Sequence, residues 1–272
     1  MILTERYTSI MLTGLMLVVC LCCHASSHHH HPKHAQAVSH DDYAKSFGRA
    51  FFDGNDFDKA LSAYDNVPAT SMTEHDLCNY ATAAYFLQQY PKALNISLYG
   101  LTQHPRQAAL NRVAFFCSTE LKQYADALRH ADNLFHHSDS LKLSYYDYLY
   151  YGRIQTIAKD YQKADSAYAC LAAEYDNALE YATYMRAKVN AQMDPDQKQG
   201  LARPYYEQLA DILTAKPEQD DTDRSRLKEC CLYLISYYFL QKDDKDKASH
   251  YARLLLAIDP DNKTALHLLG VR

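Results

Sequence analysis

The feature of this sequence that most constrains its fold is an alanine that returns at nearly regular intervals. Successive copies are 33, 34, 37, 38 and 46 residues apart. The copies are Ala60, Ala93, Ala127, Ala164, Ala202 and Ala248. Self-similarity with a period of roughly 20–50 residues is typical of repeat proteins, in which a unit cannot bury its apolar face alone and therefore stacks on its neighbours. We expect an array of similar units over residues 41–272.

A short phrase surrounds each of the first four alanines, with a polar residue and then a large residue shortly before the alanine. The phrases are Asp56-Phe57-Asp58-Lys59-Ala60, Gln89-Tyr90-Pro91-Lys92-Ala93, Gln123-Tyr124-Ala125-Asp126-Ala127 and Asp160-Tyr161-Gln162-Lys163-Ala164. Further upstream, a large residue is followed by a small one, as in Phe47-Gly48, Tyr80-Ala81 and Tyr151-Gly152. The chain has only 7 glycines and 8 prolines, too few for the many turns of an all-β fold, so helices are favoured.

This pattern resembles the tetratricopeptide repeat (TPR), a unit of about 34 residues that forms a helix–turn–helix. The resemblance implies an all-α, right-handed α-solenoid of about six TPR-like helical hairpins. The small residues are expected where the two helices of a hairpin cross closely. The last two units diverge: the fifth has an insertion at residues 194–200 between its two helices, and a polar stretch at residues 216–223 precedes the sixth. Residues 262–272 are expected to form a short C-terminal capping helix.

The resemblance also implies a binding surface, because the first helix of each TPR hairpin lines a concave groove that usually receives a peptide. The groove positions carried over to this sequence are Lys45, Arg49, Phe52, Tyr85, Arg112, Phe116, Tyr146, Arg153, Tyr184, Lys188, Tyr233 and Tyr237. The predicted groove is therefore aromatic with a basic lean, although the whole chain has a net charge of −5. We expect a protein or peptide partner with acidic segments. The alternative is that these are ordinary half-exposed helix residues.

The N-terminal segment is predicted to direct export. Arg6 precedes a run of thirteen mostly apolar residues from Met11 to Cys23, which is shorter than the about 20 residues of a membrane-spanning helix. With the small residue Ala25 after it, this run predicts a signal peptide over residues 1–25. The alternatives are an uncleaved anchor and a lipid attached to Cys20. Residues 26–40 are His-rich and are expected to form a disordered linker that either acts as a spacer or binds a divalent metal.

Several functional classes are disfavoured by the sequence. It has no Gly-rich phosphate loop, no HExxH motif and no GxSxG motif, so no enzyme activity, cofactor or defined metal site is predicted. Its acidic net charge argues against nucleic-acid binding. The favoured function is an exported protein-interaction scaffold in the periplasm or at the outer membrane, with a membrane contact only through the possible lipid anchor. A glycan or peptidoglycan binder and a metal-handling protein remain as alternatives.

The export prediction is tested by the N-terminus of the native protein. We expect mature protein to begin at or near Ser26, because cleavage follows the small residue Ala25. Mass spectrometry of the protein purified from its source measures this terminus. An intact Met1 would contradict the prediction, and a diacylated Cys20 would identify a lipoprotein instead.

Overall fold

The computed structural model describes residues 39–137 and 142–270. The predicted signal peptide, Cys20 and nearly all of the His-rich linker lie outside these ranges. Within them, all regular structure is helical and no strand occurs. The all-α prediction is confirmed. The array that the sequence presents as one stretch forms two compact units, which divide within one helix at Tyr150 and Tyr151.

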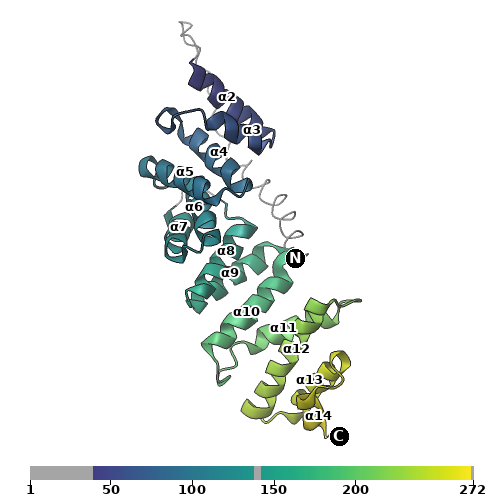
Figure 1. The fold of residues 1–272 in the computed structure, drawn as a ribbon. Coiled ribbons are helices and arrows are strands. Elements are labelled where there is room, and N and C mark those ends of the chain that lie inside the picture. The colour runs from purple at the N-terminus through teal and green to yellow at the C-terminus, as the bar shows by residue number, and fades with distance from the viewer. Residues whose placement is uncertain (1–38, 138–141, 271–272) are drawn as a thin grey trace. The chain divides into compact units, whose positions relative to one another are not determined.

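The first unit consists of helical hairpins in which each helix packs against the next (Figure 1). The hairpins are α2 (His40–Asp53) with α3 (Phe57–Tyr64), α4 (Glu74–Phe86) with α5 (Tyr90–Gln103), and α6 (Ala108–Glu120) with α7 (Tyr124–His137). The first part of α8 (Tyr145–Ile157) completes this unit, and a short 3₁₀ turn, η1 (Ala69–Ser71), links its first two hairpins.

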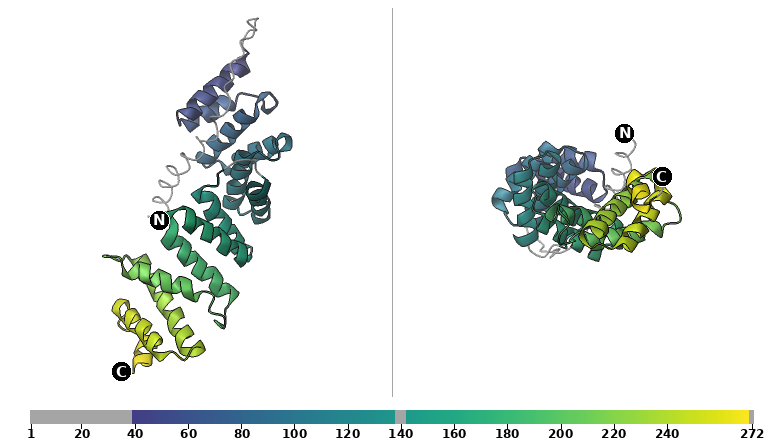
Figure 2. Two further views of the ribbon diagram at one scale, coloured as in Figure 1. Left: turned by 180° about the vertical axis from the view of Figure 1, so that it is seen from behind. Right: turned by 90° about the horizontal axis from the view of Figure 1, so that it is seen from below.

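The second unit continues the same pattern, as Figure 2 shows for its consecutive helices. After the rest of α8 come α9 (Tyr161–Glu174), the turn η2 (Asp176–Ala178), α10 (Leu179–Met193), α11 (Arg203–Thr214), α12 (Asp221–Ser236), the π-helical turn η3 (Tyr237–Gln241), α13 (Lys245–Ile258) and α14 (Lys263–Leu269). The predicted capping helix is confirmed as α14, which is capped by Asn262 and packs against α13.

The repeated phrase marks the start of the second helix of a hairpin. The side chains of Asp56, Asp160 and Asp244 accept hydrogen bonds from backbone N–H groups three residues later, which would otherwise lack a partner in the first helical turn. The residue before the cap adopts a left-handed conformation in five hairpins, with φ between 51° and 62°. These residues are Asn55, Gln88, Lys122, Lys159 and Asp243. A common three-residue turn therefore joins the two helices in these hairpins.

The recurring alanines lie where the two helices of a hairpin cross, and all six are fully buried. Two glycines on first helices allow the same close approach of the two helices. A Cβ atom at Gly48 would lie 2.7 Å from the Tyr64 ring, and one at Gly152 would lie 2.6 Å from the Tyr168 ring. Both tyrosine rings are fully buried, so they cannot move away. The small residues are therefore required by the ring that packs over them.

The insertion at residues 194–200 closes on itself. Asp194 is buried, and its Oδ2 atom accepts backbone N–H groups of Gln199 and Gly200 at 3.0 and 2.7 Å. Gly200 has φ of +70° and lies against the Tyr237 ring, which leaves no space for a side chain. The carboxylate is thus satisfied by its own loop, which accommodates the extra residues between α10 and α11.

Substitution of Gly152 by alanine tests the crossing. We expect a loss of about 1–3 kcal/mol in the free energy of unfolding, because the added methyl overlaps the rigid Tyr168 ring. Gly54→Ala is the matched control, since Gly54 is exposed, has φ of −81°, and its Cβ would come no closer than 3.3 Å to another atom, the Ala50 carbonyl oxygen. Urea denaturation followed by circular dichroism measures both. Equal stabilities for the two variants would contradict this account of the crossing.

Candidate functional site: the faces of the first helices

Four first helices begin with the same capping box, in which a cap side chain and an acidic residue three positions later bond to each other's backbone N–H groups. The pairs are Ser39 with Asp42, Thr73 with Asp76, Ser144 with Asp147, and Asp220 with Asp223. Each box places a carboxylate at the start of a first helix, where the positive end of the helix dipole favours it.

A cation neutralises each of these carboxylates. Two of the cations come from the first helix of the preceding hairpin: Arg49 binds Asp76 at 2.7 and 2.9 Å, and Arg112 binds Asp147 at 2.8 and 2.6 Å. Lys216 binds Asp223 at 2.6 Å, and Lys45 pairs with Asp42 of its own helix at 2.9 Å. The boxes therefore join successive hairpins as well as starting helices.

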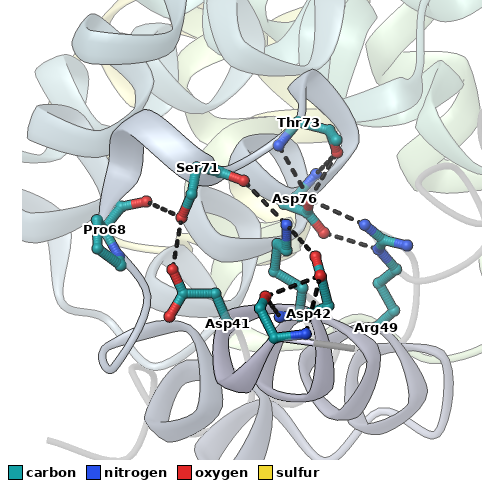
Figure 3. A network of polar contacts seen from close by, with 9 residues as sticks. Asp41, Asp42, Arg49, Pro68, Ser71, Thr73 and Asp76 are labelled. Carbon is teal, nitrogen blue, oxygen red and sulfur yellow. Dashed lines mark hydrogen bonds and ion pairs between the residues drawn. The ribbon is translucent and has the colours of Figure 1, made fainter. Parts of the chain in front are cut away.

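The contacts around Asp76 show how such a junction is built (Figure 3). Arg49 reaches across from α2 to both carboxylate oxygens, and the Thr73 hydroxyl and backbone N–H donate to the same group. Burial by itself raises the pKa of Asp76, but the hydrogen bonds from Arg49 and Thr73 outweigh it and the pKa is lowered. Ser71, beside them, donates its hydroxyl to Asp41 and to the Pro68 carbonyl.

In the first unit, the cations that were predicted to line the groove are bound to other parts of the same unit. Lys45 donates to the Ser71 carbonyl at 3.0 Å, and only 12% of its side chain is exposed. Arg112 is 4% exposed, and its partner Asp147 is fully buried. Arg49 keeps 41% of its side chain exposed while it binds Asp76. Lys45 and Arg112 thus hold adjacent segments of the chain together and are not presented on an open surface.

The predicted aromatic residues of the first unit are mostly core residues. Phe52 packs edge-on against Phe57, with ring centroids 5.6 Å apart, and Tyr146 is 7% exposed. Phe116 lies between Tyr85 and Tyr150, with centroid distances of 5.9 and 4.6 Å. Of the four predicted aromatics, only Tyr85 is partly exposed, so these rings mainly fill the interior and do not form the wall of an open groove.

In the second unit, two predicted residues come together on the faces of α10 and α12. The Tyr184 hydroxyl donates to Glu229 at 3.1 Å, and Lys188 pairs with the same carboxylate at 3.1 Å. The Arg226 guanidinium lies 4.9 Å from the centre of the Tyr184 ring. We call these four residues the Tyr184 cluster. Of their ionic side chains, 45% of Lys188, 33% of Glu229 and 19% of Arg226 are exposed.

The other predicted residues of this unit lie apart from the cluster. Arg153 is exposed on α8, whereas Tyr233 and Tyr237 are buried at 9% and 3% exposure. The Tyr233 ring packs against Tyr206 at 4.5 Å. Partner binding at the twelve predicted positions stays a prediction, and the structure brings only Tyr184 and Lys188 into one partly exposed group.

Sequence reasoning missed Arg226 and Glu229, which complete the Tyr184 cluster. The signal was available, because the two residues are three positions apart on one helix and so share a face. Glu180 was also missed, although it binds both Arg226 and Lys216 at 2.7 Å. Its partners are distant in sequence, and no local pattern indicates them.

Three further features of the described residues concern metals, membranes and thiols. Within residues 39–137 and 142–270, no group of three or more His, Cys, Asp or Glu side chains is placed to hold a metal ion. In the same part of the chain, no helix combines the length and apolar character needed to cross a bilayer. Burial raises the pKa of Cys117 and of Cys231 to about 12, so these thiols stay protonated at neutral pH.

Comparison with known proteins identifies the fold. The sequence matches no family model, and a search of curated proteins finds no match. Among solved structures, the C-terminal part of a TPR repeat-containing protein from Cytophaga hutchinsonii is 23% identical with a TM-score of 0.59, covering 86% of this chain and 89% of that one. YrrB, a TPR protein with an unusual peptide-binding site, is 14% identical with a TM-score of 0.55, covering 84% and 100%. MamA from AMB-1 is 11% identical with a TM-score of 0.55, covering 65% and 93%. This chain has the tetratricopeptide-repeat fold.

The buried pair of Arg112 and Asp147 is expected to stabilise the first unit only while both partners are present. Arg112→Met leaves the Asp147 carboxylate buried without a cation, and we expect it to cost about 3–5 kcal/mol. The double change Arg112→Met with Asp147→Asn should recover much of that loss. Arg129→Met, which breaks the exposed pair with Asp126, is the control and should cost less than about 1 kcal/mol. Denaturant unfolding measures all three, and a harmless Arg112→Met would refute this role.

Proposed function

We propose that this chain is an exported protein-interaction scaffold that binds an acidic segment of another protein on the faces of α10 and α12, at the Tyr184 cluster. Export rests on the apolar run from Met11 to Cys23 and on Ala25. Interaction as the general role rests on the TPR fold. YrrB has a peptide-binding site, and our proposal extends peptide binding to this chain.

The single observation that carries the proposal is that two cations lie against the ring of the partly exposed Tyr184. The Arg226 guanidinium lies 4.9 Å and the Lys188 ammonium 5.7 Å from the centre of its ring. Tyrosine and arginine are common anchors of protein interfaces, because they give a large contact area together with a polar group. The cluster therefore has the composition of a binding surface.

The exposure of the cluster favours an acidic partner. Lys188 is bound to Glu229 by an ion pair that water reaches from both sides, since 45% and 33% of the two side chains are exposed. The hydroxyls of Tyr184 and Tyr206 hold Glu229 in place at 3.1 and 2.9 Å, so a carboxylate of the partner would join Lys188 from its exposed side, beside Glu229. In the first unit, Arg112 is buried with its own carboxylate and is not available to a partner.

A photo-crosslinking amino acid at position 188 tests the proposal in the source organism. We expect ultraviolet light to produce an adduct that contains a peptide of another exported protein, identified by mass spectrometry. Arg226→Glu should lower the yield of that adduct by about fivefold or more, because it repels an acidic segment.

The matched control carries the same amino acid at Gln162, an exposed position on the second helix α9. Adducts of equal yield from positions 162 and 188 would place binding outside the first-helix faces. Adducts that carry only sugar polymer would replace the proposal with glycan binding, for which tyrosine rings are the expected platform.

A further inference from the structure

The outer face of the first hairpin carries an exposed aromatic stripe. Tyr43, Phe47 and Phe51 are spaced four residues apart on α2, and 57% of both Tyr43 and Phe47 is exposed. Phe51 stacks on Phe47 with ring centroids 6.3 Å apart, and the Lys59 ammonium lies 5.6 Å from the Phe51 ring. The stripe and α3 together line a shallow groove, which we call the N-terminal face. Its lining residues are His40, Tyr43, Ala44, Phe47, Phe51, Lys59, Ser62, Ala63 and Asn66.

The equivalent face of the second hairpin is covered by the first hairpin. Counted back from Ala93 and Ala60, Tyr80 is the equivalent of Phe47, Ala84 of Phe51, and Lys92 of Lys59. Tyr80 packs against the Tyr64 ring at 5.6 Å, and Ala84 is fully buried. The N-terminal face is thus a stacking face, and no described helix precedes it to cover it (Figure 1).

The covered faces show what kind of group such a surface receives. At the second hairpin, the Tyr80 hydroxyl and the Lys92 ammonium both bind Asp65, just after α3, at 2.5 and 2.6 Å. At the last hairpin, the Tyr238 hydroxyl donates to Glu207 of α11, and Lys247 lies 4.7 Å from the Tyr238 ring. In both junctions a tyrosine that lies beside a lysine donates its hydroxyl to a carboxylate in, or directly after, the preceding second helix.

The charge of the N-terminal face fits the same kind of occupant. Its ionisable side chains other than Tyr43 are Lys59 and His40, and no acidic residue is among the residues that line it. Lys59 is 64% exposed and pairs with Asp56 of its own hairpin at 2.7 Å, an exposed pair that is readily exchanged. Two copies of this face would bring Lys59 of one against Lys59 of the other, and no residue that lines the groove would offer a carboxylate across the contact, which disfavours self-association.

We propose that the N-terminal face docks an acidic amphipathic helix of another protein, which takes the place of a preceding second helix. Its apolar side covers Tyr43, Phe47 and Phe51, and a glutamate or aspartate meets Lys59. Binding of an amphipathic helix in an apolar groove is a common mode of protein recognition. This site is separate from the Tyr184 cluster and does not depend on partner binding there.

The chain has no tryptophan, so Phe47→Trp provides a single fluorescent reporter on the face of the full-length protein. The probes are two synthetic amphipathic helices with the same leucine stripe, one flanked by glutamates and the other by lysines. We expect the glutamate probe to shift the emission to shorter wavelength with saturation at micromolar concentration, and the lysine probe to bind at least about fivefold more weakly. Adding Lys59→Glu should reverse the preference, while circular dichroism confirms the helical fold.

Phe239→Trp is the matched control, because Phe239 is another exposed aromatic residue, at 41%, in the turn η3. Its emission should respond to neither probe, and Lys188→Glu should leave binding of the glutamate probe to the Phe47→Trp protein unchanged.

The proposal would be overturned if the glutamate probe had no saturable effect, or if the preference for it survived Lys59→Glu. Concentration-dependent self-association that Phe47→Glu abolishes would also overturn it, as would an indole at position 47 already shielded from iodide before any probe is added.

Discussion

The close crossing of two helices over a small residue is the constraint on which the rest of this structure depends. Where Gly48 and Gly152 lie, the ring of a tyrosine from the partner helix occupies the space that a Cβ atom would need. The recurring alanines do the same from the second helix and are fully buried. Because each crossing buries only one side of a hairpin, the other side must be covered by a neighbour, and the chain is forced to repeat. Tyrosine serves this thin architecture in two ways: the rings of Tyr64 and Tyr168 fill the crossings, while Tyr80 and Tyr184 are half-buried and their hydroxyls bind carboxylates.

The capping boxes determine what becomes of the charged residues. Each box places a carboxylate at the start of a first helix, and Asp76 and Asp147 lie close enough to the preceding hairpin to recruit its arginine. A buried carboxylate requires such a partner, because an uncompensated charge costs several kcal/mol. In the first unit, Arg49 and Arg112, which were predicted to bind a peptide, instead join neighbouring hairpins through these carboxylates. On α10 and α12 the pairs are more exposed, and there Tyr184 lies near the surface with Lys188 and Arg226 against its ring.

Local features of the fold were predictable, because they depend on residues close in sequence. The hairpins follow from the alanine spacing, and the starts of second helices follow from Asp56 and Asp160, whose caps act over three residues. Which predicted groove residues are buried in ion pairs was less predictable, because the residues that they contact are distant in sequence. Arg112 and Asp147 are separated by 35 positions, and no periodicity pairs them. The π-helical turn at Tyr237–Gln241 also escaped prediction, and its first residue packs against Gly200 in the inserted loop, which is distant in sequence.

The two ends of the described chain have different surface chemistry. At the C-terminal end, α14 packs on α13, turns its Leu268 and Leu269 toward the core of the second unit, and ends at Gly270 with φ of +68°, a conformation that stops a helix. At the other end, α2 presents Tyr43 and Phe47 to water. Terminal units of soluble repeat proteins usually carry a polar outer face, because an uncovered stacking face promotes association. At the C-terminal end, α14 therefore covers the apolar surface of α13. At the N-terminal end, α2 and α3 keep the aromatic and lysine side chains that internal hairpins use to bind a neighbouring hairpin. That difference places the strongest tendency to bind another helix at α2 and α3, outside the predicted concave groove.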